Sequence, residues 1–110
     1  DLMARPLPFT AITDTAEKFD IDFPLHPSTE APMRIHQLLG DLLETVSREV
    51  RRDPMANGDV LQALAMALAV RARMISSDPE MTTGLASDLL VAAIEGVLAA
   101  DVSSPPTGQA

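Results

Sequence analysis

The chain has 110 residues, enough for one domain, and its net charge of −8 disfavours contact with nucleic acid or with an anionic membrane surface. It contains no cysteine, which excludes disulfides and thiolate metal sites, so we expect a cytoplasmic protein. Apolar residues make up 46% of the sequence, which is enough for a globular core, but tryptophan and tyrosine are absent. Arginine far outnumbers lysine, as in proteins from GC-rich bacterial genomes.

The N-terminal segment, residues 1–31, contains four prolines, which forbid a long helix. Within it, "EKFDIDFPLHP" alternates strictly, with Phe19, Ile21 and Phe23 on one side and aspartates on the other. This alternation predicts a strand with one buried face, set in an otherwise extended arm.

A single strand cannot satisfy its own backbone groups, so the predicted strand needs a neighbour or water. Three arrangements follow from the sequence. The arm lies extended on its own helices, or it pairs with a second copy of the chain, or it adds to the sheet edge of another protein.

Three helices are predicted after the arm. The first runs from Pro32, a favoured first helical residue, to about Arg52, and has one apolar stripe. The second runs from about residue 59 to 76 and is apolar on most sides. The third opens at "SDPE", which supplies a helix cap, and runs to about residue 100.

The third helix has two apolar faces. The first holds Leu89, Leu90 and Val97 with two alanines, and the second holds Val91, Ile94 and Leu98. A three-helix bundle hides one stripe per helix, so the second face would stay in water. Full burial of each such side chain contributes roughly 1.5–3 kcal/mol, so we expect another protein surface to cover these three.

These patterns predict an all-α protein, a three-helix up-down bundle that forms a homodimer. We expect an extended arm over residues 1–31, a helical domain over 32–101 and a disordered tail over 102–110. The predicted interface holds Phe19, Ile21, Phe23, Val91, Ile94 and Leu98.

Arg71 interrupts an apolar face of the second helix. Three interpretations remain open. Its aliphatic stem covers apolar surface while the charge reaches water, or it pairs with Asp88 or Glu49, or it binds an anionic ligand or a partner's carboxylate.

The sequence shows no grouping of residues typical of catalysis. The two histidines lack a second ligand at helical spacing, and no nucleophile motif or phosphate-binding loop is present. We therefore expect no enzyme activity, no cofactor and no metal. The sequence favours a regulatory or adaptor-type protein-interaction module, which dimerises and reaches another protein through its arm. The alternative is a binder of a small apolar ligand between the second and third helices.

Overall fold

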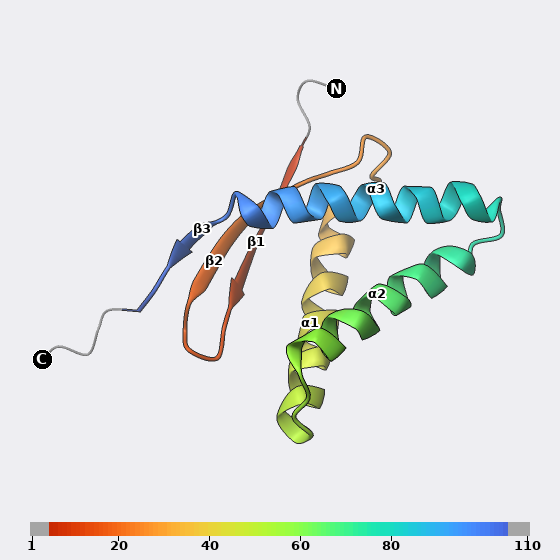
Figure 1. Ribbon diagram of the computed structural model, residues 1–110. Coiled ribbons are helices and arrows are strands. Elements are labelled where there is room, and N and C mark those ends of the chain that lie inside the picture. Colours follow the sequence, from red (N-terminus) through yellow and green to blue (C-terminus); the bar gives the residue numbers. More distant parts are fainter. Residues whose placement is uncertain (1–4, 106–110) are drawn as a thin grey trace, which may run out of the picture. The chain divides into compact units, whose positions relative to one another are not determined.

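Figure 1 shows the computed structural model of the protein, which describes residues 5–105. In chain order its elements are β1 (Pro6–Ile12), β2 (Lys18–Pro24), α1 (Pro32–Arg52), α2 (Asn57–Arg73), α3 (Pro79–Leu98) and β3 (Asp101–Ser103). They divide into two compact units. Of the described residues, the sheet unit comprises 5–32 and 90–105, and the helix unit comprises 33–89. Helix α3 begins in the helix unit and ends in the sheet unit.

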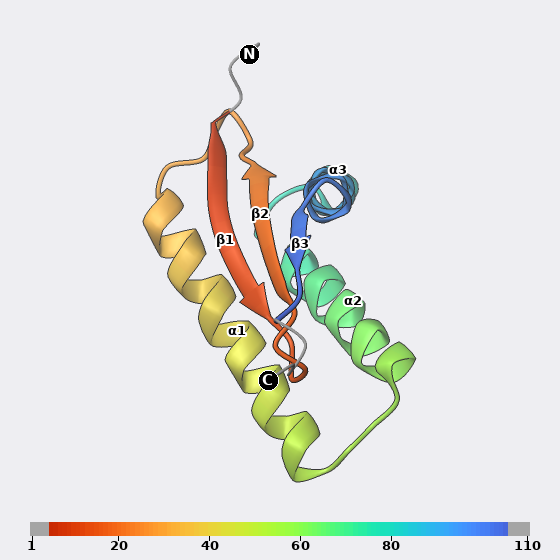
Figure 2. The same ribbon diagram turned by 90° about the vertical axis from the view of Figure 1, so that its left-hand side faces the viewer.

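The predicted all-α fold is wrong. The structure contains a three-stranded antiparallel sheet in the order β1-β2-β3, so the protein is mixed α and β. The alternating segment is the central strand of this sheet, and its neighbours are the proline-containing segment before it and the short "DVS" segment after α3 (Figure 2). Pairing with the chain's own preceding segment was not among the three arrangements expected for the arm.

The register of the hairpin gathers the apolar side chains on one face. Leu7 lies opposite Phe23, Phe9 opposite Ile21, and Ala11 opposite Phe19. Leu7 and Ile21 are buried, with exposed fractions of 5% and 7%. The rings of Phe9 and Phe23 meet in a tilted pair with centroids 6.4 Å apart, a geometry that aromatic pairs favour.

The opposite face of the hairpin carries its polar side chains, together with three prolines and Ile12. The Thr10 hydroxyl donates a hydrogen bond of 2.8 Å to the carboxylate of Asp20 directly across the strands. Lys18 reaches the same carboxylate at 3.9 Å. The Thr10–Asp20 pair lies across the strands and stabilises the sheet by a fraction of a kcal/mol, whereas Lys18 and Asp20 are two residues apart on the same strand.

The prolines of β1 lie where a strand tolerates them. The carbonyl of Arg5 accepts a hydrogen bond from the Leu25 N–H, and the Thr13 N–H donates to the Glu17 carbonyl. Hydrogen-bonded positions alternate along an antiparallel pair. The backbone N–H and C=O groups of the odd-numbered residues of β1 therefore point toward β2, and those of the even-numbered residues point toward the open edge. Pro6 and Pro8 therefore place their missing N–H groups on the open edge of the sheet, where no hydrogen bond is lost.

The hairpin turns at Asp14–Ala16, and Ala16 has a positive φ of 65°. The Thr13 hydroxyl accepts a hydrogen bond from the Glu17 N–H at 3.1 Å, and the Ala16 N–H donates to the Thr13 carbonyl. A left-handed residue at the end of a three-residue loop is the usual way to close such a hairpin, although glycine is the residue that adopts it without strain.

The predicted helices are present, with α1 at the expected bounds and α2 and α3 within a few residues of theirs. The carboxylate of Asp78 accepts a hydrogen bond from the Glu80 N–H at 3.3 Å, so Asp78 supplies the predicted cap of α3. The predicted bundle core is not found. In the described part of the chain, α1 has no buried residue and Ala72 is the buried residue of α2.

The predicted division of the chain into an arm, a helical domain and a tail stays a prediction. The structure pairs Asp101–Ser103 with β2, and the tail expected to be disordered extends beyond the described residues, which end at 105.

Candidate interaction surface

The C-terminal half of α3 meets the sheet through its smallest residues. A Cβ atom placed on Gly96 would lie 3.3 Å from Cδ1 of Phe23 and 3.3 Å from Cδ of Pro24. Gly96 is buried, and Ala92, Ala93 and Ala100 are half-buried. Small side chains let a helix backbone approach its neighbour closely. Within the sheet unit, α3 therefore approaches β2 at Gly96, and the half-buried alanines lie on the same side of the helix.

The larger side chains of the same helix segment stay exposed. We call them the α3 stripe: Leu90, Val91, Ile94, Val97 and Leu98. Their exposed fractions range from 44% at Val97 to 81% at Leu98. At about 100° per residue they share one side of the helix, turned away from Gly96. The stripe is thus a continuous apolar surface within the sheet unit.

The structure brings the six predicted interface residues into one unit but gives them different surroundings. Ile21 is buried on the apolar face of the sheet, while Phe19 and Phe23 are half-buried beside it. Val91, Ile94 and Leu98 lie on the exposed α3 stripe, with 53%, 46% and 81% exposure. Their role as an interface stays a prediction.

Two members of the stripe were assigned by sequence to a different face of the helix. Leu90 and Val97 were grouped with Leu89 and two alanines, because apolar residues occur all round this helix. The signal that separates them is side-chain size. The small residues face the sheet, and the large residues gather on the other side.

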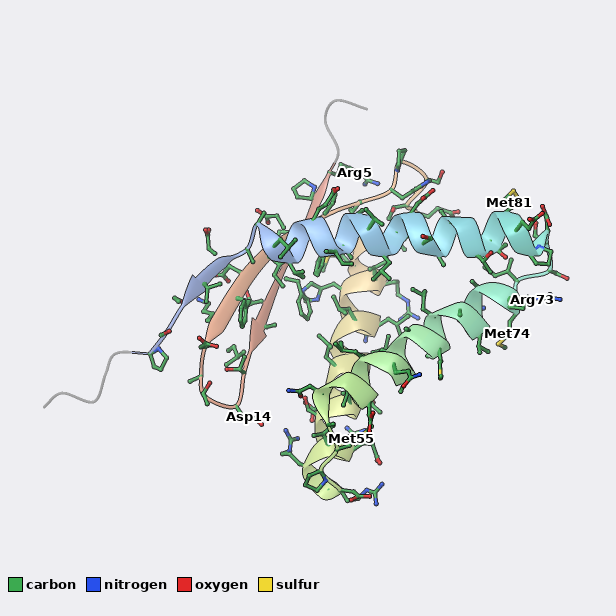
Figure 3. The ribbon with its side chains drawn as sticks, in the orientation of Figure 1. Arg5, Asp14, Met55, Arg73, Met74 and Met81 are labelled. Carbon is green, nitrogen blue, oxygen red and sulfur yellow. The ribbon has the colours of Figure 1, made fainter. Side chains whose placement is uncertain are left out.

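A second apolar surface lies within the helix unit. An open groove of about 290 Å³ runs between α1 and α2, and its lining includes Val46, Val50, Met55, Val60, Leu64 and Ala67. We call it the α1–α2 groove. Figure 3 shows Met55 at the turn that joins the two helices. The sequence had placed an apolar cavity between the second and third helices, whereas this groove involves the first and second.

Arg71 lies on the groove side of α2. It follows Ala67 by one helical turn, and Ala67 follows Leu64 by almost one turn, so the three residues share a face. Arg71 is exposed and forms no hydrogen bond or ion pair with residues 5–105. Of the two carboxylates proposed from the sequence, Glu49 pairs with Arg52. The sequence alone does not decide among the three interpretations of Arg71.

The chemistry available at these surfaces is limited to apolar burial and exposed charges. Between residues 5 and 105, no three histidine, aspartate or glutamate side chains come together as a metal site would require. His26 accepts a hydrogen bond from the Ser28 N–H at Nδ1, at 3.0 Å, within its own turn. The candidate site is therefore a pair of apolar surfaces.

Of the helices described, α3 alone is long and apolar enough to cross a membrane by length and composition. Only 11% of its most apolar window is buried. Length and composition are weak evidence for a span, because core helices of soluble proteins meet the same test. Asp88 and Glu95 also place two carboxylates along the helix, and each is costly in hydrocarbon.

Comparison of the chain with protein-family models, with curated proteins and with solved structures gives no match. Any functional assignment therefore depends on the physical properties of the two surfaces.

Proposed function

We propose that the protein is a small, non-enzymatic interaction module of the regulatory or adaptor type, and that it self-associates as a homodimer through the α3 stripe. One observation carries the proposal. Helix α3 approaches the sheet at Gly96 and leaves its large apolar residues exposed, which is the reverse of a helix that completes its own core.

The amount of exposed apolar surface supports a partner. Among residues 5–105 the buried apolar side chains are Leu7, Ile21 and Ala72. Each large aliphatic side chain contributes roughly 1.5–3 kcal/mol when it is fully buried. Leaving the five stripe residues in water forgoes much of the stability that a chain of this length needs.

A second copy is favoured over strand addition by another protein. The open edge of β1 presents Pro6 and Pro8, so an incoming strand would find two backbone donors missing. A two-fold dimer needs no further component, because both copies present the same surfaces.

The test replaces two stripe residues by acids. Ile94→Glu with Leu98→Glu adds two charges to the α3 stripe, and we expect the sedimentation-equilibrium mass to fall from dimer to monomer. Met81→Glu is the matched control, because Met81 is 60% exposed on the same helix but lies off the stripe (Figure 3).

An unchanged dimer mass in the double variant would contradict the proposal. So would a wild-type chain that is monomeric and floats with lipid vesicles, since the stripe would then be covered by lipid.

A further inference from the structure

The α3 stripe and the α1–α2 groove are complementary in kind: one is a convex row of aliphatic side chains on a helix, and the other is an apolar channel between two helices. Leu90, Ile94 and Val97 stand at i, i+4 and i+7, the spacing with which a helix anchors in a groove. We propose that the α3 stripe of one copy occupies the α1–α2 groove of the other, reciprocally, so that a three-helix bundle forms between copies. This rests on the proposed homodimer.

The groove suits a protein helix better than a small ligand. At about 290 Å³ it is at or below the lower limit of typical ligand pockets, and it is partly open. Its lining is mostly aliphatic, and Thr45 and Glu49 are its polar members. No row of convergent polar groups is present along this channel to orient a small molecule.

Arg71 adds a charge at one end of this surface. Val60, Leu64 and Ala67 line the groove, and Arg71 continues their face one turn later. It has no ionic partner within the described chain. A cation left unpaired at the end of an apolar helical face is well placed to meet a carboxylate of an incoming helix.

Helix α3 offers such a carboxylate at the matching distance. Leu98 and Asp88 are ten residues apart, and Val60 and Arg71 are eleven apart. Both separations correspond to about 15 Å along a helix axis. If α3 of the second copy runs antiparallel to α2, Leu98 lies near Val60, Ile94 lies near Leu64, and Asp88 lies level with Arg71. Asp88 stands at the edge of the stripe, about 60° round the helix from Val91, so the long Arg71 side chain reaches it from the side. Asp88 has no ionic partner in residues 5–105 either.

Folding of α3 back on its own α2 gives a different register. Residues 74–78 join the two helices, so an antiparallel hairpin within one chain would bring Arg71 beside Met81. Asp88 would then lie about 10 Å further along the helix. The identity of the residue beside Arg71 therefore distinguishes pairing between copies from closure within one chain.

The experiment is a charge-reversal cycle on the full-length chain, with the dimer dissociation constant measured by sedimentation. Arg71→Glu and Asp88→Arg should each raise the dissociation constant about tenfold, because each places like charges side by side. The double variant Arg71→Glu with Asp88→Arg should restore it to within about threefold of the wild type, since the pair is rebuilt in reverse.

Arg73→Glu is the matched control. Arg73 is exposed in the same last turn of α2 (Figure 3), and it lies about 200° round the helix from Arg71, away from the groove face. Combined with Asp88→Arg, it should give no rescue.

Each contrary outcome has a distinct meaning. Single reversals without effect, or a double reversal without rescue, would overturn this inference while leaving dimerisation through the stripe intact. A monomeric wild type would overturn both proposals. A groove that takes up a fatty acid while the chain stays monomeric would assign it to a ligand instead.

Discussion

Gly96 sets how closely α3 approaches the sheet. A methyl group at this position would lie 3.3 Å from Phe23 and Pro24 and 3.4 Å from the Asp22 carbonyl oxygen. The two 3.3 Å separations are tighter than ordinary van der Waals contact, so the Phe23 and Pro24 rings would have to shift by a few tenths of an ångström. Gly84, on the same helix, has no atom within 4 Å of such a methyl group.

These two glycines make a matched pair of substitutions. Gly84→Ala should raise the free energy of unfolding by about 1 kcal/mol, because alanine loses less backbone entropy than glycine in a helix. Gly96→Ala gains the same helix propensity but pushes α3 against β2. We therefore expect the free energy of unfolding to stay unchanged or to fall. Urea unfolding at a fixed protein concentration measures both. Equal stabilisation by the two changes would show that α3 does not pack on β2 through Gly96.

At the scale of elements, the hairpin depends on the placement of its prolines. Pro6 and Pro8 remove two backbone donors from the open edge of β1, and such edges invite strand addition and aggregation. This placement also explains why sequence reasoning missed β1. Prolines argue against a strand in general, and only the hydrogen-bond register shows that these two face outward.

Restoring a donor at this edge should promote association between sheets. Pro8→Thr introduces a residue that is common in strands and restores a backbone N–H that points away from β2. We expect assemblies larger than the dimer to appear in light scattering as the protein concentration rises. Pro27→Thr adds an N–H outside the strands, where the residue is exposed, and should change nothing. If the Pro8 variant behaves like the Pro27 variant, the prolines do not protect this edge.

Helices were more accessible to sequence reasoning than the sheet. The apolar spacing of α1 and the caps of α3 are local signals, and these elements begin where they were expected. The alternation in β2 was also local and was recognised as a strand. Its neighbours could not be found in this way, because β3 has three residues and β1 is interrupted by prolines.

The interaction surface was predictable in part for a similar reason. The excess of apolar side chains on α3 is visible in the sequence, and Val91, Ile94 and Leu98 are exposed in the structure. Which side of α3 meets the sheet depends on the contact at Gly96, which is made with residues more than 70 positions earlier in the chain. Nothing local to either segment indicates that contact.

At the scale of the whole molecule, all three helices expose large apolar side chains among residues 5–105. Helix α1 exposes Leu38 and Leu42 at 59% and 51%, α2 exposes Leu61 at 67%, and the α3 stripe is exposed along its length. A single chain of 11.7 kDa in this state is poorly stabilised. Association of two copies would bury the stripe and the groove together, and folding and dimerisation would then be coupled.

The molar mass in solution tests this account most directly. Multi-angle light scattering on the eluting protein at micromolar concentration should give twice 11.7 kDa. A mass of 11.7 kDa would show that the chain stays single in solution and would contradict the account.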